Sequence, residues 1–309
     1  MAITKVQVNT EYGKCVLEES RVVLTLPGAG ENAKPICRFV HISDSHMVVS
    51  RPEDSPEIIE KVAHTRKFWN QFTDIRAELP DGSERRLDLM EVNYAVAERI
   101  RELSPDGVFI TGDVVDNPSV SNYITLGEYM DSLGTKCFIS LGNHDCPEED
   151  SDDSTRAAYD SVMGKRDDVM IDTVCGIDIV SVFDGYGTVT AKETEILRKQ
   201  LERGRPTVVL LHAPVKTLSV EEPARRSWGD DLSHWIVGSD GQSRECLDFV
   251  RLINENKDNI LAVFSGHVHL ASGGGEAEDQ GERFSEDEVL QYTALPAFMG
   301  FLRVIDIVG

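Results

Sequence analysis

The chain has 309 residues, of which 40% are hydrophobic, and its 31 Lys and Arg against 54 Asp and Glu give a formal net charge of −23. This composition favours a large folded core over a disordered chain. Because phosphate groups are bound by basic side chains in excess, it disfavours a nucleic-acid-binding protein and a protein held on an anionic membrane.

Signals for membrane insertion or secretion are missing from the sequence. No apolar stretch reaches membrane-spanning length, and residues 1–14 contain no apolar signal segment. The six cysteines are scattered and form no C-x-x-C pair, which is typical of reduced cysteines. We therefore expect a cytoplasmic protein with no membrane partner.

The order of apolar runs predicts an α/β fold. Short strands around residues 6–8, 16–17 and 22–26, with Gly13 as a turn, predict a β-hairpin or meander extension over residues 1–37. The main strands are expected at residues 39–43, 108–111, 136–141, 177–183, 207–211 and 260–265. Several are apolar on both faces, as in strands covered by helices on each side. Since no linker or repeat divides the chain, we expect a single domain over residues 1–309.

Helical periodicity fills the segments between the strands. One predicted helix face consists of residues spaced +4, +3, +4, namely Phe68, Phe72, Ile75 and Leu79. A second helix is expected over residues 89–103. A capping box at Thr190 and Glu193 opens a third that runs to Leu201, and residues 244–256 form a fourth amphipathic segment.

Asp, Asn and His residues follow five of the six main strands. In chain order they are Asp44, His46, Asp113, Asn143, His144, Asp145, His212, His267 and His269. The carboxyl ends of strands are where ligand sites form in open α/β sheets. Imidazole and carboxylate together suit Zn, Mn, Fe or Co. No cysteine lies at these strand ends, which disfavours a structural zinc site.

The spacing of these residues favours two metal ions. Side chains alternate along a strand, so Asp44-x-His46 and His267-x-His269 are each expected to present two ligands on one side of an extended segment and to chelate one ion. Seven ligands are too many for one tetrahedral ion and suit two ions that share a carboxylate. Asp113 is the expected bridge, since it lies centrally and its carboxylate has two oxygens.

The ordered motifs D-x-H, G-D-x-x-D, G-N-H-D, a lone His and G-H-x-H, from Asp44 to His269, resemble those of the calcineurin-like metallophosphoesterases. The resemblance implies a layered α/β/β/α sandwich with mixed sheets and a metal site at the strand carboxyl ends. It implies two ions bridged by Asp113. The first would be bound by Asp44, His46 and His269, and the second by Asn143, His212 and His267.

The resemblance also implies a reaction. A hydroxide held between the metals would attack phosphorus in a small phosphodiester or phosphomonoester. His144 would donate a hydrogen bond or a proton to the leaving oxygen, and Asp145 would orient that imidazole.

Departures from related subfamilies narrow the substrate. Asn117 stands where the Ser/Thr protein phosphatases of this superfamily carry an Arg. The acidic composition opposes the cationic path that a DNA-repair nuclease needs. The sequence is then most similar to the bacterial cyclic-nucleotide and glycerophosphodiester phosphodiesterases, so we expect a small phosphoester substrate and no nucleic-acid partner.

Simpler interpretations remain open. Gly112-Asp113 and Gly142-Asn143 are also typical of turns, and Asp116 is better explained as a helix N-cap or as a support for the site than as a ligand. We expect His41 in the core and His64 exposed on a helix. For the whole chain, a binding scaffold with impaired catalysis and a single-metal hydrolase are the alternative functions.

Two further features concern access to the site. Residues 221–241 form an insert with Arg225, Arg226, His234 and two tryptophans, Trp228 and Trp235, which either overhangs the site or is an ordinary surface loop. Residues 146–153 carry five carboxylates and no Lys or Arg, and residues 270–290 carry seven against one Arg. Both runs follow metal motifs directly. We therefore expect an acidic rim that admits small phosphoesters and repels polyanions.

Overall fold

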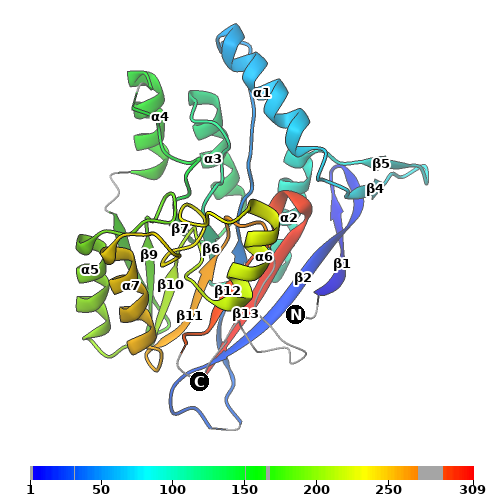
Figure 1. Ribbon diagram of the computed structural model, residues 1–309. Coiled ribbons are helices and arrows are strands. Elements are labelled where there is room, and N and C mark those ends of the chain that lie inside the picture. Colours follow the sequence, from blue (N-terminus) through cyan, green and yellow to red (C-terminus); the bar gives the residue numbers. More distant parts are fainter. Residues whose placement is uncertain (1–2, 31, 150, 165–167, 271–287) are drawn as a thin grey trace.

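The computed structural model describes residues 3–30, 32–149, 151–164, 168–270 and 288–309, and in them two mixed β-sheets lie face to face (Figure 1). The first sheet has the strand order β5-β4-β2-β13-β3-β6-β7, with β1 beside β2. Its strands are β1 (Ile3–Thr10), β2 (Gly13–Thr25), β3 (Pro35–Ile42), β4 (Arg76–Glu78), β5 (Glu84–Arg86), β6 (Gly107–Thr111), β7 (Cys137–Ser140) and β13 (Phe301–Val308).

The second sheet has the order β12-β11-β10-β9-β8. Its strands are β8 (Val169–Val174), β9 (Ile177–Val182), β10 (Thr207–Leu210), β11 (Ile260–Ser265) and β12 (Gln291–Thr293). The helices are α1 (Pro56–Trp69), α2 (Leu89–Leu103), α3 (Val120–Ser132), α4 (Asp153–Met163), α5 (Ala191–Leu201), α6 (Leu218–Trp228), α7 (Arg244–Glu255) and the short 3₁₀ helix η1 (Ala297–Met299).

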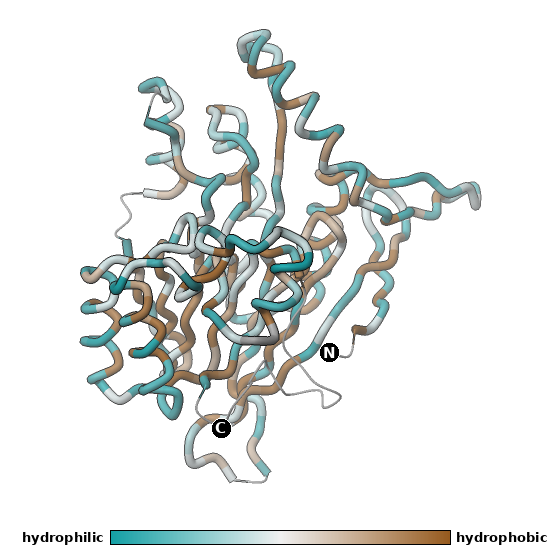
Figure 2. The backbone as a smooth tube through the Cα atoms, in the orientation of Figure 1, coloured by the Kyte–Doolittle hydropathy of each residue, from teal (hydrophilic) through white to brown (hydrophobic). Residues whose placement is uncertain are grey.

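Three apolar layers hold the sheets and helices together. Between the sheets, Phe39 of β3 stacks on Phe109 of β6 with ring centroids 4.5 Å apart, and Phe264 of β11 packs against them from the opposite sheet. Outside the first sheet lie α2 and α3, and outside the second lie α5 and α7. Figure 2 shows the same division, with apolar strands inside and hydrophilic stretches on the outer helices. The predicted α/β/β/α sandwich is confirmed.

The N-terminal extension is part of the first sheet. β1 and β2 pair antiparallel, and the turn contains Gly13 at φ +116°, as the sequence predicts. β2 then pairs in parallel with β13, which pairs antiparallel with β3 on its other edge. The C-terminal strand therefore joins the N-terminal hairpin to the strands of the site. That residues 1–309 form one domain stays a prediction.

The helices predicted over residues 89–103, after Thr190 and over residues 244–256 are confirmed by α2, α5 and α7. The helix face predicted from Phe68 to Leu79 is wrong. α1 ends at Trp69, and the chain enters β4 at Arg76. Tertiary contacts at Asn70 explain the break, because its side-chain oxygen accepts the N–H of Leu89, 2.8 Å away, at the start of α2.

The strands that carry the site end close to one another. β3, β6 and β7 are parallel neighbours, as are β10 and β11 in the other sheet. Their carboxyl ends lie on the same side of the sandwich (Figure 1). In the described part of the chain, no helix is long and apolar enough to span a bilayer.

Candidate metal centre

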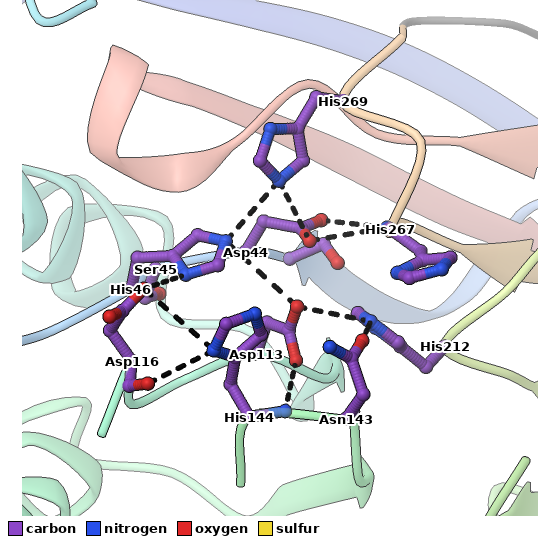
Figure 3. A network of polar contacts seen from close by, with 12 residues as sticks. Asp44, Ser45, His46, Asp113, Asp116, Asn143, His144, His212, His267 and His269 are labelled. Carbon is purple, nitrogen blue, oxygen red and sulfur yellow. Dashed lines mark hydrogen bonds and ion pairs between the residues drawn. The ribbon is translucent and has the colours of Figure 1, made fainter. Parts of the chain in front are cut away.

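All seven predicted metal ligands come together at these strand ends, and they form two groups (Figure 3). The first group contains Asp44, His46 and His269. Nε2 of His269 lies 3.3 Å from Oδ1 of Asp44 and 3.3 Å from Nε2 of His46. One carboxylate oxygen and two imidazole nitrogens thus lie close enough together to bind one cation.

The second group contains Asp113, His212 and His267, with Asn143 beside them. Nε2 of His212 lies 3.2 Å from Oδ2 of Asp113 and 3.2 Å from Oδ1 of Asn143. The rings of His212 and His267 have centroids 4.5 Å apart. This group also combines imidazole with side-chain oxygen donors.

Asp113 lies between the two groups. Its Oδ2 is 3.9 Å from Nε2 of His46 and 3.2 Å from Nε2 of His212. Its other oxygen accepts the main-chain N–H of His144 at 3.0 Å, which fixes the plane of the carboxylate. The same oxygen of Asp113 therefore faces a histidine of each group.

Hydrogen bonds on the far side of three imidazoles fix which nitrogen faces the centre. Nδ1 of His46 donates to Oδ1 of Asp116 at 2.9 Å, and Nδ1 of His212 donates to the main-chain oxygen of Thr111 at 2.7 Å. Nε2 of His267 donates to the main-chain oxygen of His234 at 2.9 Å. The opposite nitrogens are therefore the ones whose lone pairs would bind a metal, as in metal-ligating histidines. These donors fit divalent transition metals.

The main chain at these ligands is not extended, so the predicted alternation along a strand is wrong. Asp44, His46, Asp113, His267 and His269 all have φ between +42° and +66°, in the left-handed region. Such strained conformations in non-glycine residues are typical of functional sites. In consequence the two residues of His267-x-His269 point into different groups, whereas Asp44 and His46 share one.

Two glycines of the sequence motifs lie so close to metal-binding side chains that no Cβ fits there. A Cβ at Gly266 would lie 1.7 Å from Oγ of Ser43 and 2.3 Å from Oδ2 of Asp44. A Cβ at Gly142 would lie 2.2 Å from Oδ1 of Asp113. Any side chain at either position would therefore displace a ligand carboxylate.

Charges inside the centre balance one another in the metal-free chain. Burial opposes ionisation of Asp44, but His269 and His212 hold the pKa of its carboxyl at about 2. Burial alone would lower the pKa of His212, but Asp113 and Asp44 raise it to about 10. The pKa of Asp113 is likewise well below its usual range, because His212 outweighs the effect of burial. A protonated His212 therefore stands where a cation would bind.

Asp145 does not hold the imidazole of His144, so its predicted orienting role is wrong. Its buried carboxylate accepts main-chain N–H groups from Val114 at 2.8 Å, Val115 at 3.1 Å and Gly142 at 2.8 Å. It thereby joins the loop that carries Asp113 to the loop that carries Asn143 and His144. Its role in this structure is to hold two ligand-bearing loops together.

Asp116 makes the contact that was expected of Asp145. Its main-chain oxygen accepts Nδ1–H of His144 at 3.0 Å, and its carboxylate accepts from His46 and from Nε1 of Trp69. The N-cap of the following helix α3 is Ser119, so Asp116 supports the site and caps no helix. Asp116, His46 and His144 also lie close enough together to hold a cation, but Nδ1 of each histidine already donates to Asp116.

The other predicted histidine positions agree with the structure. His41 is fully buried and its Nε2 lies 2.8 Å from the hydroxyl of Thr111, whereas His64 is exposed on α1. One supporting residue was missed. Asp184 follows β9 and accepts the main-chain N–H groups of His212 and Ala213, each at 2.7 Å. It is the acidic residue after the one main strand that was not counted among the five with polar ends, so the strand-end signal applied to it as well.

A cavity of about 480 Å³ opens over the metal ligands. The sequence did not predict that aromatic residues form the walls of this cavity. The one exception is the interpretation in which residues 221–241 overhang the site. The insert does so: Trp235 stacks on His267 with centroids 4.8 Å apart, and Trp228 stacks on Trp235 at 4.2 Å. On the other side, Trp69 of α1 stacks on His46 at 4.1 Å.

The acidic rim stays a prediction. Most of the 270–290 segment lies outside the described residues, as does position 150 in the other run. In the described part of residues 146–153, Asp152 caps α4 by accepting the main-chain N–H of Thr155 at 2.7 Å. At least one of these carboxylates thus has a structural use.

Comparisons with known proteins agree with the motifs. A probable cyclic nucleotide phosphodiesterase of Synechococcus sp. is 26% identical over 184 residues, which are 57% of this chain and 63% of that protein. The alignment thus spans less than two thirds of that relative. A dimetal phosphatase from Danio rerio superposes with a TM-score of 0.50 at 12% identity, covering 86% of this chain and 89% of the other, and shows a shared fold.

The profile of the calcineurin-like phosphoesterases matches residues 37–271, which include every predicted ligand. This confirms the resemblance inferred from the order of the motifs. The chain therefore belongs to the calcineurin-like phosphoesterase family.

Proposed function

We propose that this protein hydrolyses small phosphoesters at a centre of two metal ions. The position of Asp113 carries the proposal, because its Oδ2 faces Nε2 of His46 at 3.9 Å and Nε2 of His212 at 3.2 Å. A carboxylate placed between two sets of imidazole donors is suited to bridge two cations. A single-ion site would leave one of the two sets without a use.

The proposed ligand sets divide between the two groups. Asp44, His46 and His269 would hold the first ion, Asn143, His212 and His267 would hold the second, and Asp113 would contact both. Two bound cations would lower the pKa of an attacking water and neutralise charge on the phosphoryl oxygens. Imidazole, amide and carboxylate donors suit Mn, Fe, Zn or Co, so the identity of the ions depends on supply as well as affinity.

His144 is the proposed proton donor to the leaving oxygen. Its Nδ1 donates to the main-chain oxygen of Asp116 at 3.0 Å, and the ring lines the cavity with its side chain 37% exposed. Burial lowers the pKa of His144, but Asp113 and Asp116 outweigh it, so the pKa is raised on balance. A protonated His144 would give the proton on Nε2 to the leaving oxygen as the bond to phosphorus breaks.

The proposed substrates are small molecules, with no nucleic-acid partner. The net charge of −23 opposes binding of a polyanion. Among the described residues, the cavity lining contains no Lys or Arg that would bind a second phosphate. The relative from Synechococcus sp. is described as a probable cyclic nucleotide phosphodiesterase, which supports a diester as the first substrate to test.

The proposal is tested by metal analysis and hydrolysis on the same samples. Metal-reconstituted protein should hydrolyse bis(p-nitrophenyl) phosphate, and Asp113→Ala should lose both hydrolysis and bound metal. For a diester of simple alcohols, whose alkoxide leaving group needs a proton, His144→Gln should retain the metals and lose about 10²–10⁴-fold in kcat, the usual contribution of acid–base catalysis. Loss of metal from the His144 variant would show that the proton-donor assignment is wrong.

The two alternative functions give different results in that experiment. A single-metal hydrolase would bind one ion per chain and still hydrolyse the diester. A binding scaffold would show no hydrolysis above the Asp113→Ala variant with any phosphoester, whatever its metal content.

A further inference from the structure

The cavity over the metal ligands has a polar floor and apolar walls. Its floor consists of the site residues, and among the described residues the rest of its lining is apolar. Phe68, Trp69 and Phe72 form one wall, Trp228 and Trp235 form the opposite wall, and Phe298 closes one side. A phosphoryl group on the floor would thus place its organic group among aromatic rings.

One indole N–H group on each wall is already used within the protein. Nε1 of Trp69 donates to Oδ1 of Asp116 at 2.6 Å, and Nε1 of Trp228 donates to the main-chain oxygen of Val268 at 3.0 Å. These rings therefore offer a ligand their apolar surfaces rather than hydrogen bonds. Apart from the site residues themselves, the described lining has no hydroxyl, amide, carboxylate or cationic group for a sugar, a base edge or a second phosphate.

Stacking on metal ligands fixes both walls close to the reaction. Trp69 lies on His46 with centroids 4.1 Å apart and an interplanar angle of 25°. Trp235 lies on His267 at 4.8 Å and 27°, and Trp228 continues the stack at 4.2 Å and 15°. Because the walls are preformed, a ligand needs little reorganisation to use them.

The mouth of the cavity leaves aromatic surface in water. Phe68 and Phe72 are 46% and 50% exposed, and their rings pack edge to face at 5.5 Å. Adjacent exposed aromatic rings at a cavity mouth are typical of a binding surface. An apolar group covering them would remove this surface from water and gain affinity in proportion to the area covered.

From these observations we infer that the substrate is a phosphoester with a single phosphoryl group and an uncharged, apolar aryl or alkyl group. This inference rests on the proposed function and specifies its substrate class. Recognition would come from apolar contact, so it would depend on the size of the organic group and be insensitive to its hydroxyl groups.

The test uses three p-nitrophenyl phosphodiesters whose second ester group is methyl, n-hexyl or 2,3-dihydroxypropyl, so that the leaving group stays the same. We expect kcat/KM to be about 10- to 100-fold higher for the hexyl than for the methyl ester, since its five further methylenes would be partly buried. The dihydroxypropyl ester should resemble the methyl ester. Equal values for all three would overturn the inference while leaving hydrolysis, and hence the proposed function, intact.

Variants locate the effect in the cavity. Phe72→Ala, in a half-exposed loop position where folding should tolerate it, and Trp228→Ala should each reduce the hexyl-to-methyl ratio several-fold. Leu247→Ala is the matched control, since Leu247 is 50% exposed on α7 and does not line the cavity. An unchanged ratio in both cavity variants would contradict the assignment of these walls.

Binding distinguishes failure of the inference from failure of the proposed function. If metal-loaded protein hydrolyses neither the three diesters nor p-nitrophenyl phosphate, the proposed function is wrong, and calorimetry with hexylphosphonate and methylphosphonate still decides whether the cavity holds an apolar subsite. Binding of hexylphosphonate about tenfold or more tighter supports an apolar subsite. Equal affinity overturns it.

Discussion

Replacement of Asp145 by asparagine tests how the two ligand-bearing loops are held together. The carboxylate accepts three main-chain N–H groups, two at Oδ1 from Val114 and Val115 and one at Oδ2 from Gly142. An asparagine has almost the same shape, but only one of its two terminal atoms accepts hydrogen bonds. In either orientation its NH₂ group faces a buried main-chain N–H, so at least one amide of the loops loses its partner.

The expected cost follows from that one defect. Loss of a hydrogen bond to a charged group, with a buried N–H left unpaired, should lower the free energy of unfolding by about 2–4 kcal/mol. For a chain of 309 residues this corresponds to a fall in melting temperature of roughly 3–6 °C. Since the loops carry Asp113 and Asn143, metal affinity should also fall by about 10–100-fold, as is common when a supporting partner of a metal site is lost.

Thermal unfolding and metal titration of Asp145→Asn measure both effects. Asp258→Asn is the matched control, because Asp258 is exposed in the turn after α7. Suppose instead that Asp145→Asn melts with the parent protein, keeps its metals and only shifts the pH profile of kcat. The carboxylate would then act on the His144 imidazole, and the structural assignment would be refuted.

Two further predictions concern the centre itself. Gly266→Ala should lose the first ion, because the new Cβ would lie 2.3 Å from Oδ2 of Asp44, and a folded variant with full metal content by elemental analysis would contradict this. In metal-free protein, Asp113 and Asp44 outweigh burial and raise the pKa of His212 to about 10, above the roughly 6.5 expected when unfolded. This pairing therefore stabilises the fold fully below about pH 6.5 and is lost as the pH rises towards 10. The melting temperature of a chelator-treated sample should therefore fall over that pH range. The apparent metal affinity should rise with pH, because the metal has to displace the proton on His212. An affinity that does not depend on pH would contradict a protonated His212.

The identity of the ligands could be predicted from the sequence because each one directly follows an apolar strand. Asp44, Asp113 and His212 are positioned by β3, β6 and β10, and parallel neighbours end at the same edge. Local sequence thus determines both the residue and its place in the sheet. Their left-handed main chain could not be read in this way, since Asp and His carry no signal for a positive φ comparable to that of glycine.

Partners within the site depend on distances that the sequence does not contain. Asp145 adjoins His144 in the chain, yet its carboxylate points to the main chain of two loops, and Asp116 supports the imidazole instead. Asp184 could have been found from its place after β9. Its contact with the N–H of His212 still depends on how β9 and β10 pair.

The aromatic walls show why helical periodicity alone gave a wrong helix prediction around Phe68 and Phe72. Phe68 and Phe72 recur at a helical spacing, but they line a cavity and lie on either side of the end of α1. An apolar side chain that faces a ligand cavity gives the same sequence pattern as one that faces the core. Trp69 and Trp228 come from segments far apart in the chain, so their common cavity appears only in the folded protein.

Anomalous diffraction from crystals of the manganese-loaded protein tests the central claim most directly. The account predicts two peaks, one on each side of Oδ2 of Asp113, with His46 and His269 at the first and His212 and His267 at the second. A single peak, or a second peak held by Asp116 and His144 away from His212, would contradict it.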